Sequence, residues 1–410
     1  MEFYYRHKYV EKLLSYKDVH YIKVLTGIRR SGKSTILIQY KNKLIAEHGI
    51  SEEQIIEYNF NNPFFSRYNY LKLYSEIVNR AVKNRINYVF LDEIQDVKSW
   101  EKCVIGLFEH KELKFDIYLT GSNSRMLSSE LSTLLTGRAK QIKVFPLTFK
   151  EFVEASKNTK NIYESFHDYA EIGGLGLIIP DINNIERAKE NLLDVLQDTI
   201  RKDIENKHHS TKNISIEKTI KYVLNNIGKP ISSHKTVQHT NVNSESKINH
   251  VSFARYLKWG TDAMILQRVD YIDKKTNSIL DTSGKYYAGD IGILNSMTNF
   301  KDSTLGAKLE NIVLLELLSQ GWEVYTLKVY QKNTDNKEID FVIKNKQVIK
   351  YIQVTHTLNN ANKHREIDNL LQFKNAYEKI CIFLNNESDN ENDGVRRVDL
   401  IRWLLGDEKI

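Results

Sequence analysis

Three short stretches of the chain consist mostly of apolar and β-branched residues, over residues 21–26, 87–91 and 115–120. Runs that are apolar along their whole length, rather than at every second position, are typical of strands covered on both faces of a parallel sheet. After the first run, Ile36, Leu37, Tyr40 and Leu44 recur with helical spacing. The pattern predicts an α/β domain in which the first strand is followed by a helix.

A phosphate-binding loop is expected between that strand and that helix. The chain there reads Gly27-Ile28-Arg29-Arg30-Ser31-Gly32-Lys33-Ser34-Thr35, which fits G-x-x-x-x-G-K-[ST]. The glycines let the backbone turn tightly and present N–H groups to phosphate oxygens, and the helix beginning at Lys33 adds its positive end. We expect these nine residues to bind nucleotide, with Lys33 reaching the β- and γ-phosphates and the Ser34 hydroxyl ligating Mg²⁺. The flanking pattern disfavours the alternative of a glycine-bearing turn that matches by chance.

The second apolar run ends in two acids, Asp92 and Glu93, which is the Walker B pattern. We expect Asp92 to hold the Mg²⁺ shell and Glu93 to orient and deprotonate the attacking water. For an isolated pair of this kind a helix N-cap is the favoured interpretation. Its place after the phosphate loop favours a Mg²⁺-ATP site, so ATP and Mg²⁺ are the expected cofactors.

Two further candidates follow the third run. Ser122 or Asn123 is placed to sense the γ-phosphate and position water, the alternative being a turn capped by the asparagine side chain. Arg138 precedes a fourth strand over residues 141–145. It is a candidate arginine finger that neutralises transition-state charge, within the chain or from a neighbouring subunit, and otherwise a surface arginine.

Beyond residue 150 the pattern becomes helical. Residues 151–212 contain a glycine-rich bend at 173–176 and a long amphipathic helix over 185–207, expected as a helical lid or linker. Residues 213–290 indicate a winged helix, with helices over 214–227, from Ser232 and over 252–259, and wing strands over 264–271 and 285–288. The third helix carries Arg255 and Lys258, and DNA contact and protein contact are equally expected for it.

Four stretches together resemble the prokaryotic AAA-superfamily ATP-binding proteins that carry a restriction-endonuclease-like C-terminal domain. They cover residues 26–34, 91–95, 119–123 and 146–152. The resemblance covers nearly the whole chain and implies an ATPase domain over residues 1–150.

The last part, residues 291–410, resembles a PD-(D/E)xK nuclease core in the order of its helices and strands. Glu310 and Asp340 match the first two acids of that core, but Gln353 stands for the third carboxylate and Thr355 for the lysine. A neutral amide is a weaker ligand for a hard cation, and losing the lysine removes charge that would stabilise the attacking hydroxide. Glu338 lies two residues before Asp340, so we expect it on the same strand face, where it could compensate in part. We therefore expect a retained fold with a binding or structural role rather than an active nuclease.

Composition sets outer limits on this assignment. A chain of 410 residues exceeds a single core, and its net charge of +7 is a mild indication of anionic partners. Cys103 and Cys381 are far apart and indicate reduced thiols, and no run is long and apolar enough for a membrane span. We expect a cytoplasmic α/β ATPase that couples nucleotide state to DNA or a partner protein, as a monomer or an oligomer. The alternatives are an ATP-dependent DNA nuclease and a nucleotide-binding switch without turnover.

Overall fold

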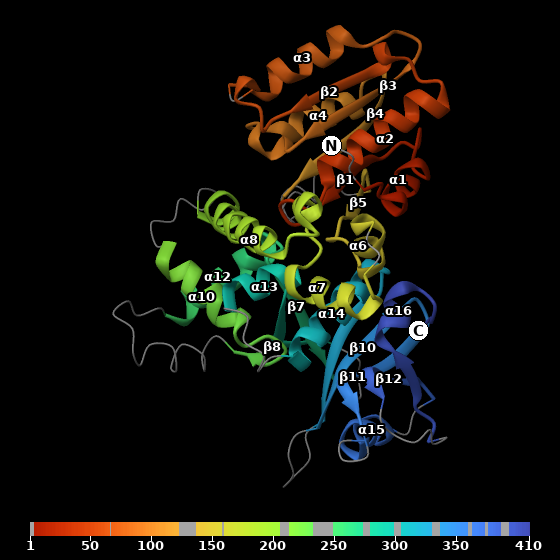
Figure 1. Cartoon of the computed structure of the whole chain (residues 1–410). Helices are drawn as coiled ribbons and strands as arrows, with labels where there is room; N and C mark the ends of the chain where they lie inside the picture. The colour runs from red at the N-terminus through yellow and green to blue at the C-terminus, as the bar shows by residue number, and fades with distance from the viewer. Residues whose placement is uncertain are drawn as a thin grey trace. The chain divides into compact units, whose positions relative to one another are not determined.

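The structure is a computed structural model of the whole chain (Figure 1). It describes residues 4–65, 67–122, 137–157, 160–205, 213–232, 249–273, 279–298, 305–329, 337–359, 363–373, 376–386 and 393–410. The chain forms two compact units: unit 1 comprises residues 1–145 with 262–264, and unit 2 comprises residues 146–261 with 265–410. The candidate Asn123 lies outside the described residues, as does the helix expected after Ser232, since the described range ends at residue 232.

Unit 1 is an α/β domain on a five-stranded, all-parallel sheet. The strand order is β2-β3-β4-β1-β5. The strands are β1 (Ile22–Thr26), β2 (Ile55–Asn59), β3 (Ile86–Asp92), β4 (Lys114–Gly121) and β5 (Ala139–Lys143). The helices are α1 (His7–Leu14), α2 (Lys33–His48), α3 (Tyr70–Arg80) and α4 (Trp100–Phe108).

The continuous burial of the central strands has a simple cause, because helices cover both faces of this sheet (Figure 1). One face packs against α3 and α4, with Leu73 and Val104 among the buried side chains. The other face packs against α1 and α2, with Val10 and Tyr40 in that core. The expected parallel α/β architecture is confirmed. The order places the carboxyl ends of β1, β3 and β4 side by side, which is where the phosphate loop and both Walker B acids emerge.

Unit 2 begins with helices and closes with a large mixed sheet. Its helices are α6 (Phe149–Ser156), α7 (Ile162–Ile172), α8 (Ile185–Thr199), α10 (Asn213–Leu224), α12 (His250–Asp262), α13 (Ile291–Thr298), α14 (Leu305–Ser319), α15 (Lys363–Leu371) and α16 (Leu400–Leu405). The long helix expected over 185–207 is α8 followed by a π-helical turn over Ile200–Glu205. Among the described residues, no helix combines the length and the apolar character that a bilayer span requires.

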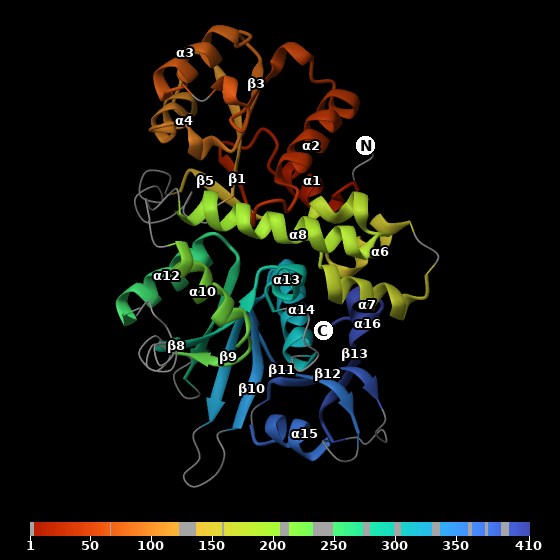
Figure 2. The same ribbon diagram turned by 60° about the vertical axis from the view of Figure 1, so that its left-hand side comes forward.

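The eight-stranded sheet of unit 2 has the order β13-β12-β11-β10-β9-β7-β8-β6. Its strands are β6 (Pro230–Ile231), β7 (Leu266–Ile272), β8 (Ile279–Ala288), β9 (Glu323–Val329), β10 (Lys337–Asn345), β11 (Val348–Leu358), β12 (Glu378–Asn386) and β13 (Arg396–Asp399). The hairpin β7–β8, expected as the wing, is joined to β9 by parallel pairing of Tyr271 with Thr326 and Ile272 with Leu327. Figure 2 shows this continuity beside α10 and α12. The segments expected as winged helix and nuclease-like domain therefore share one sheet.

A tight junction in unit 2 explains the glycine-rich bend near residue 173. The buried Asp290 carboxylate accepts hydrogen bonds from the N–H groups of Gly174 at 2.9 Å and Gly292 at 2.8 Å. A Cβ on Gly174 would lie 2.2 Å from the carbonyl oxygen of Leu147, and one on Gly292 would lie 2.2 Å from that of Ile172. These glycines are needed for close backbone approach, so the bend is a packing feature and not a second phosphate loop.

Candidate functional site

The phosphate loop takes its shape from its two glycines. Gly32 caps the start of α2 with φ at 94°, a conformation that a Cβ would strain. Gly27 is needed for a different reason, because a Cβ there would lie 2.3 Å from the carbonyl oxygen of Val144. Val144 in turn donates its N–H to the Thr26 carbonyl at 2.7 Å, which fixes this neighbour in place. The loop thus turns tightly at both ends and leads directly into a helix N-terminus.

Lys33 lies within the loop that it is expected to serve. It is 4% exposed, and its Nζ donates to the carbonyl oxygens of Gly27 at 2.9 Å and Ile28 at 3.1 Å. The Ser31 hydroxyl is buried and has no hydrogen-bond partner among the described atoms. The loop therefore holds a buried ammonium and an unsatisfied hydroxyl, which suits an anionic ligand.

Asp92 is brought to the loop by the parallel pairing of β3 beside β4. The Ser34 hydroxyl donates to Asp92 Oδ1 at 2.9 Å, and the Thr120 hydroxyl donates to the same oxygen. Asp92 is 6% exposed, and burial raises its pKa above the ordinary aspartate value, while the hydrogen bonds from Thr120 and Ser34 oppose that shift. The structure therefore brings Lys33, Ser34 and Asp92 together, as the sequence predicts.

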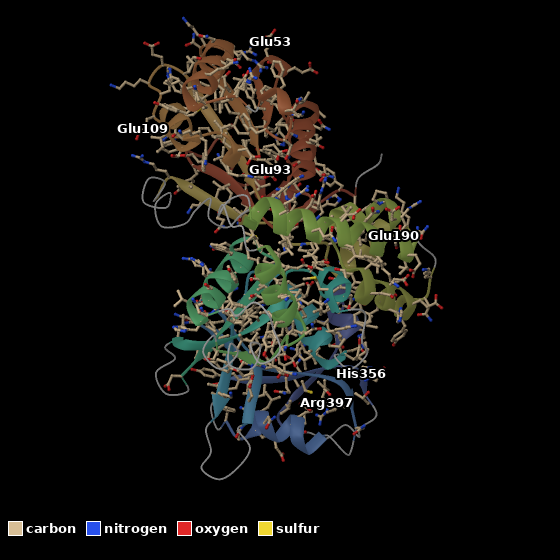
Figure 3. All side chains as sticks on the ribbon, turned by 90° about the vertical axis from the view of Figure 1, so that its left-hand side faces the viewer. Glu53, Glu93, Glu109, Glu190, His356 and Arg397 are labelled. Carbon is tan, nitrogen blue, oxygen red and sulfur yellow. The ribbon has the colours of Figure 1, made fainter. Side chains whose placement is uncertain are left out.

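Glu93 lies directly after β3, where the backbone turns. Its φ of 54° is in the left-handed region, so the chain turns sharply directly after β3. The Thr120 hydroxyl accepts a hydrogen bond from the Glu93 N–H at 2.9 Å, and the Gln95 amide donates to Glu93 Oε2. Glu93, labelled in Figure 3, follows the carboxyl end of β3, and the phosphate loop follows the carboxyl end of β1 at the same edge of the sheet. Glu93 is thus oriented by two neighbours at the correct edge of the sheet.

Thr120 is a site residue that the sequence candidates did not include. It lies at the end of β4, is fully buried, and touches both Walker B residues. Of the two expected sensors, Ser122 is buried two residues further on and Asn123 lies outside the described residues. A polar residue ending an apolar strand beside Walker B was the available signal, and Thr120 is the first such residue.

Within this chain Arg138 lies away from the phosphate loop. Its carbonyl accepts the N–H of Ile22, so it stands at the amino end of β1, while the phosphate loop follows the carboxyl end. The five-residue strand separates the two by about 16 Å. The Arg138 guanidinium pairs with Glu109 at 2.8 Å and is 41% exposed; Figure 3 labels Glu93 and Glu109 well apart. Within the chain Arg138 therefore lies at the edge of the sheet opposite the phosphate loop, and its role as an arginine finger stays a prediction that a neighbouring subunit would have to meet.

The nuclease-like candidates in unit 2 form a buried polar cluster. Asp340 Oδ2 accepts the N–H of Val354 at 2.9 Å, and the Tyr287 hydroxyl donates to Glu310 at 2.8 Å. Burial raises the pKa of both carboxyls, well above the usual range for Asp340. The Gln353 amide donates to Glu366 at 3.1 Å, whereas its Oε1 is buried without a partner. Among the described residues, no three acidic, histidine or cysteine side chains are arranged to hold a metal.

Lys285, on a strand distant in the sequence, also belongs to this cluster, and the sequence candidates did not include it. Lys285 on β8 is 4% exposed and forms an ion pair with Glu338 on β10. Burial favours its neutral form, but Glu310, Asp340 and Glu338 outweigh burial and raise its pKa. Thr355, at the usual lysine position, instead bonds to the Thr357 carbonyl at 3.1 Å. The Lys285 ammonium is thus the cation of this cluster. Its place there follows from the presence of β8 and β10 in one sheet.

Helix α12 shows the basic residues expected in a recognition position. Arg255 and Lys258 are exposed, and the Arg255 guanidinium lies 5.3 Å from the centre of the Trp259 ring. Their exposure leaves both groups accessible to an anionic partner or to a protein surface.

Family models match three parts of the chain. Residues 19–153 match an AAA domain, residues 163–304 match a domain of unknown function (DUF8612), and residues 305–402 match another (DUF4143). The AAA match spans β1 to α6 and includes every described residue of the nucleotide-binding candidate site, and an AAA domain implies nucleotide binding.

Curated relatives extend this similarity over the full length. An uncharacterized protein of Haemophilus influenzae is 31% identical over 407 residues, covering 98% of both chains. Uncharacterized protein MJ1544 of Methanocaldococcus jannaschii is 32% identical over 373 residues, covering 87% of this chain and 78% of its own. Among solved structures, the Walker-type ATPase PABY2304 of Pyrococcus abyssi matches 72% of this chain and 95% of its own, with 17% identity and a TM-score of 0.43.

Proposed function

Because the chain belongs to the family of AAA-domain P-loop proteins with C-terminal domains of unknown function, we propose that unit 1 binds ATP with Mg²⁺ and hydrolyses it. The observation that supports this most is the meeting of Lys33, Ser34, Asp92 and Glu93 at one sheet edge. The nine residues 27–35 form the phosphate cradle in this proposal.

The residues present fit a magnesium ion. Mg²⁺ takes hard oxygen donors in proteins, and a hydroxyl and a carboxylate are donors of this kind. Ser34 Oγ and Asp92 Oδ1 are separated by 2.9 Å. Ser34 and Asp92 would therefore hold the ion, directly or through its water, and its charge would offset that of the phosphates.

The chain's own groups divide the work of hydrolysis. Lys33 exchanges its bonds to the Gly27 and Ile28 carbonyls for phosphate oxygens and neutralises their charge. Glu93, held by Gln95, positions the attacking water and accepts its proton. Thr120 keeps Asp92 and Glu93 in fixed relation. Asn123 is proposed as the γ-phosphate sensor.

We propose that the nucleotide state of unit 1 is passed to unit 2, which engages DNA or a partner protein. Exposed Arg255 and Lys258 on α12 support an anionic partner. A binding role suits the C-terminal cluster better than DNA cleavage. Lys285 already compensates its acids, Gln353 is uncharged, and Thr355 is bonded to its own strand.

The proposal is tested by titrating the full chain with Mg²⁺-ATP. We expect Lys33→Ala to weaken ATP binding by about a hundredfold, because a charge-assisted contact to phosphate is lost. Lys41→Ala is the matched control, since Lys41 lies on the same helix but pairs with Glu57 at the surface. Absence of ATP binding by the native chain, or equal affinity in Lys33→Ala, would overturn the proposal.

A further inference from the structure

A buried arginine near the N-terminus contacts the phosphate loop from outside the motif. Arg6 is 3% exposed. Its Nη1 donates to the Ser31 carbonyl at 3.2 Å, and its Nη2 donates to the Phe145 carbonyl at 3.1 Å. The guanidinium also lies 4.7 Å from the centre of the Tyr9 ring. One side chain therefore joins the segment before α1, the phosphate loop and the segment after β5.

The backbone of this segment is itself anchored, so the guanidinium is not held by its own contacts alone. The Arg6 N–H donates to Gln39 Oε1 at 3.0 Å, and the Gln39 amide donates to the Tyr4 carbonyl at 2.8 Å. Gln39 lies on α2, the helix that directly follows the phosphate loop. The position of Arg6 is therefore fixed relative to the loop from two sides.

We propose that Arg6 is a positioning residue that holds the phosphate loop in its ligand-binding conformation; this inference rests on the proposed function of unit 1. In a trans peptide the carbonyl and the N–H point in opposite directions. Because Arg6 binds the Ser31 carbonyl, the N–H of Gly32 in the same peptide points away from Arg6. Arg6 thereby holds the Ser31–Gly32 peptide in one of two opposite orientations, the one in which the Gly32 N–H is directed to phosphate.

Gly32 makes such a restraint necessary. Its φ of 94° is open to glycine at little cost, and glycine also allows many other conformations. A loop ending in glycine therefore loses backbone entropy when phosphate orders it, unless another group has already fixed the peptide. A hydrogen bond from a buried, permanently charged guanidinium to the Ser31 carbonyl supplies that restraint.

The second nitrogen of the guanidinium ties the loop to the segment after β5. The Phe145 carbonyl, its other acceptor, follows Val144, whose carbonyl stands against Gly27. Both glycine ends of the loop are thus positioned against residues 144–145. A lysine at position 6 has no planar fork to span the two carbonyls, so it is expected to replace the arginine only in part.

The test compares the affinities of ATP, ADP and adenosine for the full chain by calorimetry. We expect Arg6→Met to weaken ATP and ADP binding by about tenfold or more, because the loop must be ordered by the ligand, while adenosine binding is unchanged. Arg6→Lys is expected to give an intermediate loss. If Arg6→Met does not fold, the same comparison is made with Arg6→Lys.

Tyr9→Phe is the matched control. It removes the hydroxyl that accepts the Phe145 N–H at 3.0 Å and so loosens the same region without touching the Ser31 carbonyl. We expect Tyr9→Phe to lower the melting temperature and leave ATP affinity unchanged. Equal losses for all three ligands, or for Tyr9→Phe and Arg6→Met, would reduce Arg6 to a purely structural role. A native chain that binds ATP tightly while Arg6→Met binds it equally well overturns this inference but not the proposed function; a native chain that binds no ATP overturns both.

Discussion

Asp92 and Glu93 are adjacent acids with different surroundings, and we propose different tasks for them. Asp92 accepts the hydroxyls of Ser34 and Thr120, which leaves it on the phosphate-loop side of the strand end. Glu93 follows a left-handed turn and is oriented by Gln95. Thr120 is the residue common to both, because its hydroxyl donates to Asp92 and accepts from the Glu93 N–H. One hydroxyl therefore links the two acids, and we expect their proposed roles to depend on it.

Replacing Thr120 with valine should test this dependence. Valine keeps the shape but removes the hydroxyl, so Asp92 loses a hydrogen bond and the buried Glu93 N–H loses its acceptor. We expect ATP turnover to fall by about 10- to 100-fold with a smaller change in ATP affinity, as measured by steady-state phosphate release. Thr120→Ser should restore most of the rate. Native turnover in the Thr120→Val variant would show that Thr120 has no part in the site.

Sequence reasoning found the residues that lie within a local motif and missed those whose place beside the motif depends on the fold. Lys33, Ser34 and Asp92 lie within motifs, and the structure brings them together. Arg6 lies 25 residues before Ser31, and no spacing rule connects the two. For Arg138 the following strand was recognised in the sequence, but not the edge of the sheet at which the arginine lies.

At the scale of elements, burial explains which strands were recognisable. Strands β1, β3 and β4 are buried along nearly their whole length and therefore appear as apolar runs. Strand β2 lies at the edge of the sheet and alternates between buried and exposed residues, so its short run was not singled out. Glycines are equally ambiguous in sequence. The close approach that requires Gly292 involves Ile172, which is distant in the chain.

Two helical glycines offer a direct comparison at this scale. Gly292 and Gly306 are each the second residue of a helix, α13 and α14. A Cβ on Gly292 would lie 2.2 Å from the Ile172 carbonyl oxygen, whereas nothing lies within 4 Å of one on Gly306. We expect Gly292→Ala to lower the free energy of unfolding by about 2 kcal/mol or more. Gly306→Ala should raise it by about 0.5 kcal/mol. Urea unfolding measures both free energies. A change of the same sign in the two variants would contradict the close packing at Gly292.

At the scale of the whole molecule, unit 2 is joined across its expected internal boundary. Residue 290 was expected to separate a winged helix from a nuclease-like domain, yet β7 pairs with β9 and Lys285 on β8 pairs with Glu338 on β10. Breaking a buried pair by removing one partner leaves an uncompensated charge. The two segments are therefore expected to unfold together.

Lys285→Met tests this cooperation. We expect it to lower the free energy of unfolding by about 3 kcal/mol, because Glu310, Glu338 and Asp340 lose their shared cation. Hydrogen exchange should show peptides of β8 and β10 losing protection together. Lys344→Met, at an exposed lysine of β10, is the control and should leave protection unchanged. Loss of protection confined to β8 would show that the segments are independent.

The most direct test of ATP hydrolysis by unit 1 is single-turnover phosphate release from bound ATP, with the full chain in excess over nucleotide. The native chain should release phosphate, and Glu93→Gln should slow the release by about 10²- to 10⁴-fold while ATP affinity is retained, because only the base is lost. Glu57→Gln, at a surface carboxylate of β2, should release phosphate at the native rate. Phosphate release by Glu93→Gln at the native rate, or a native chain that holds ATP without cleaving it, would contradict the account.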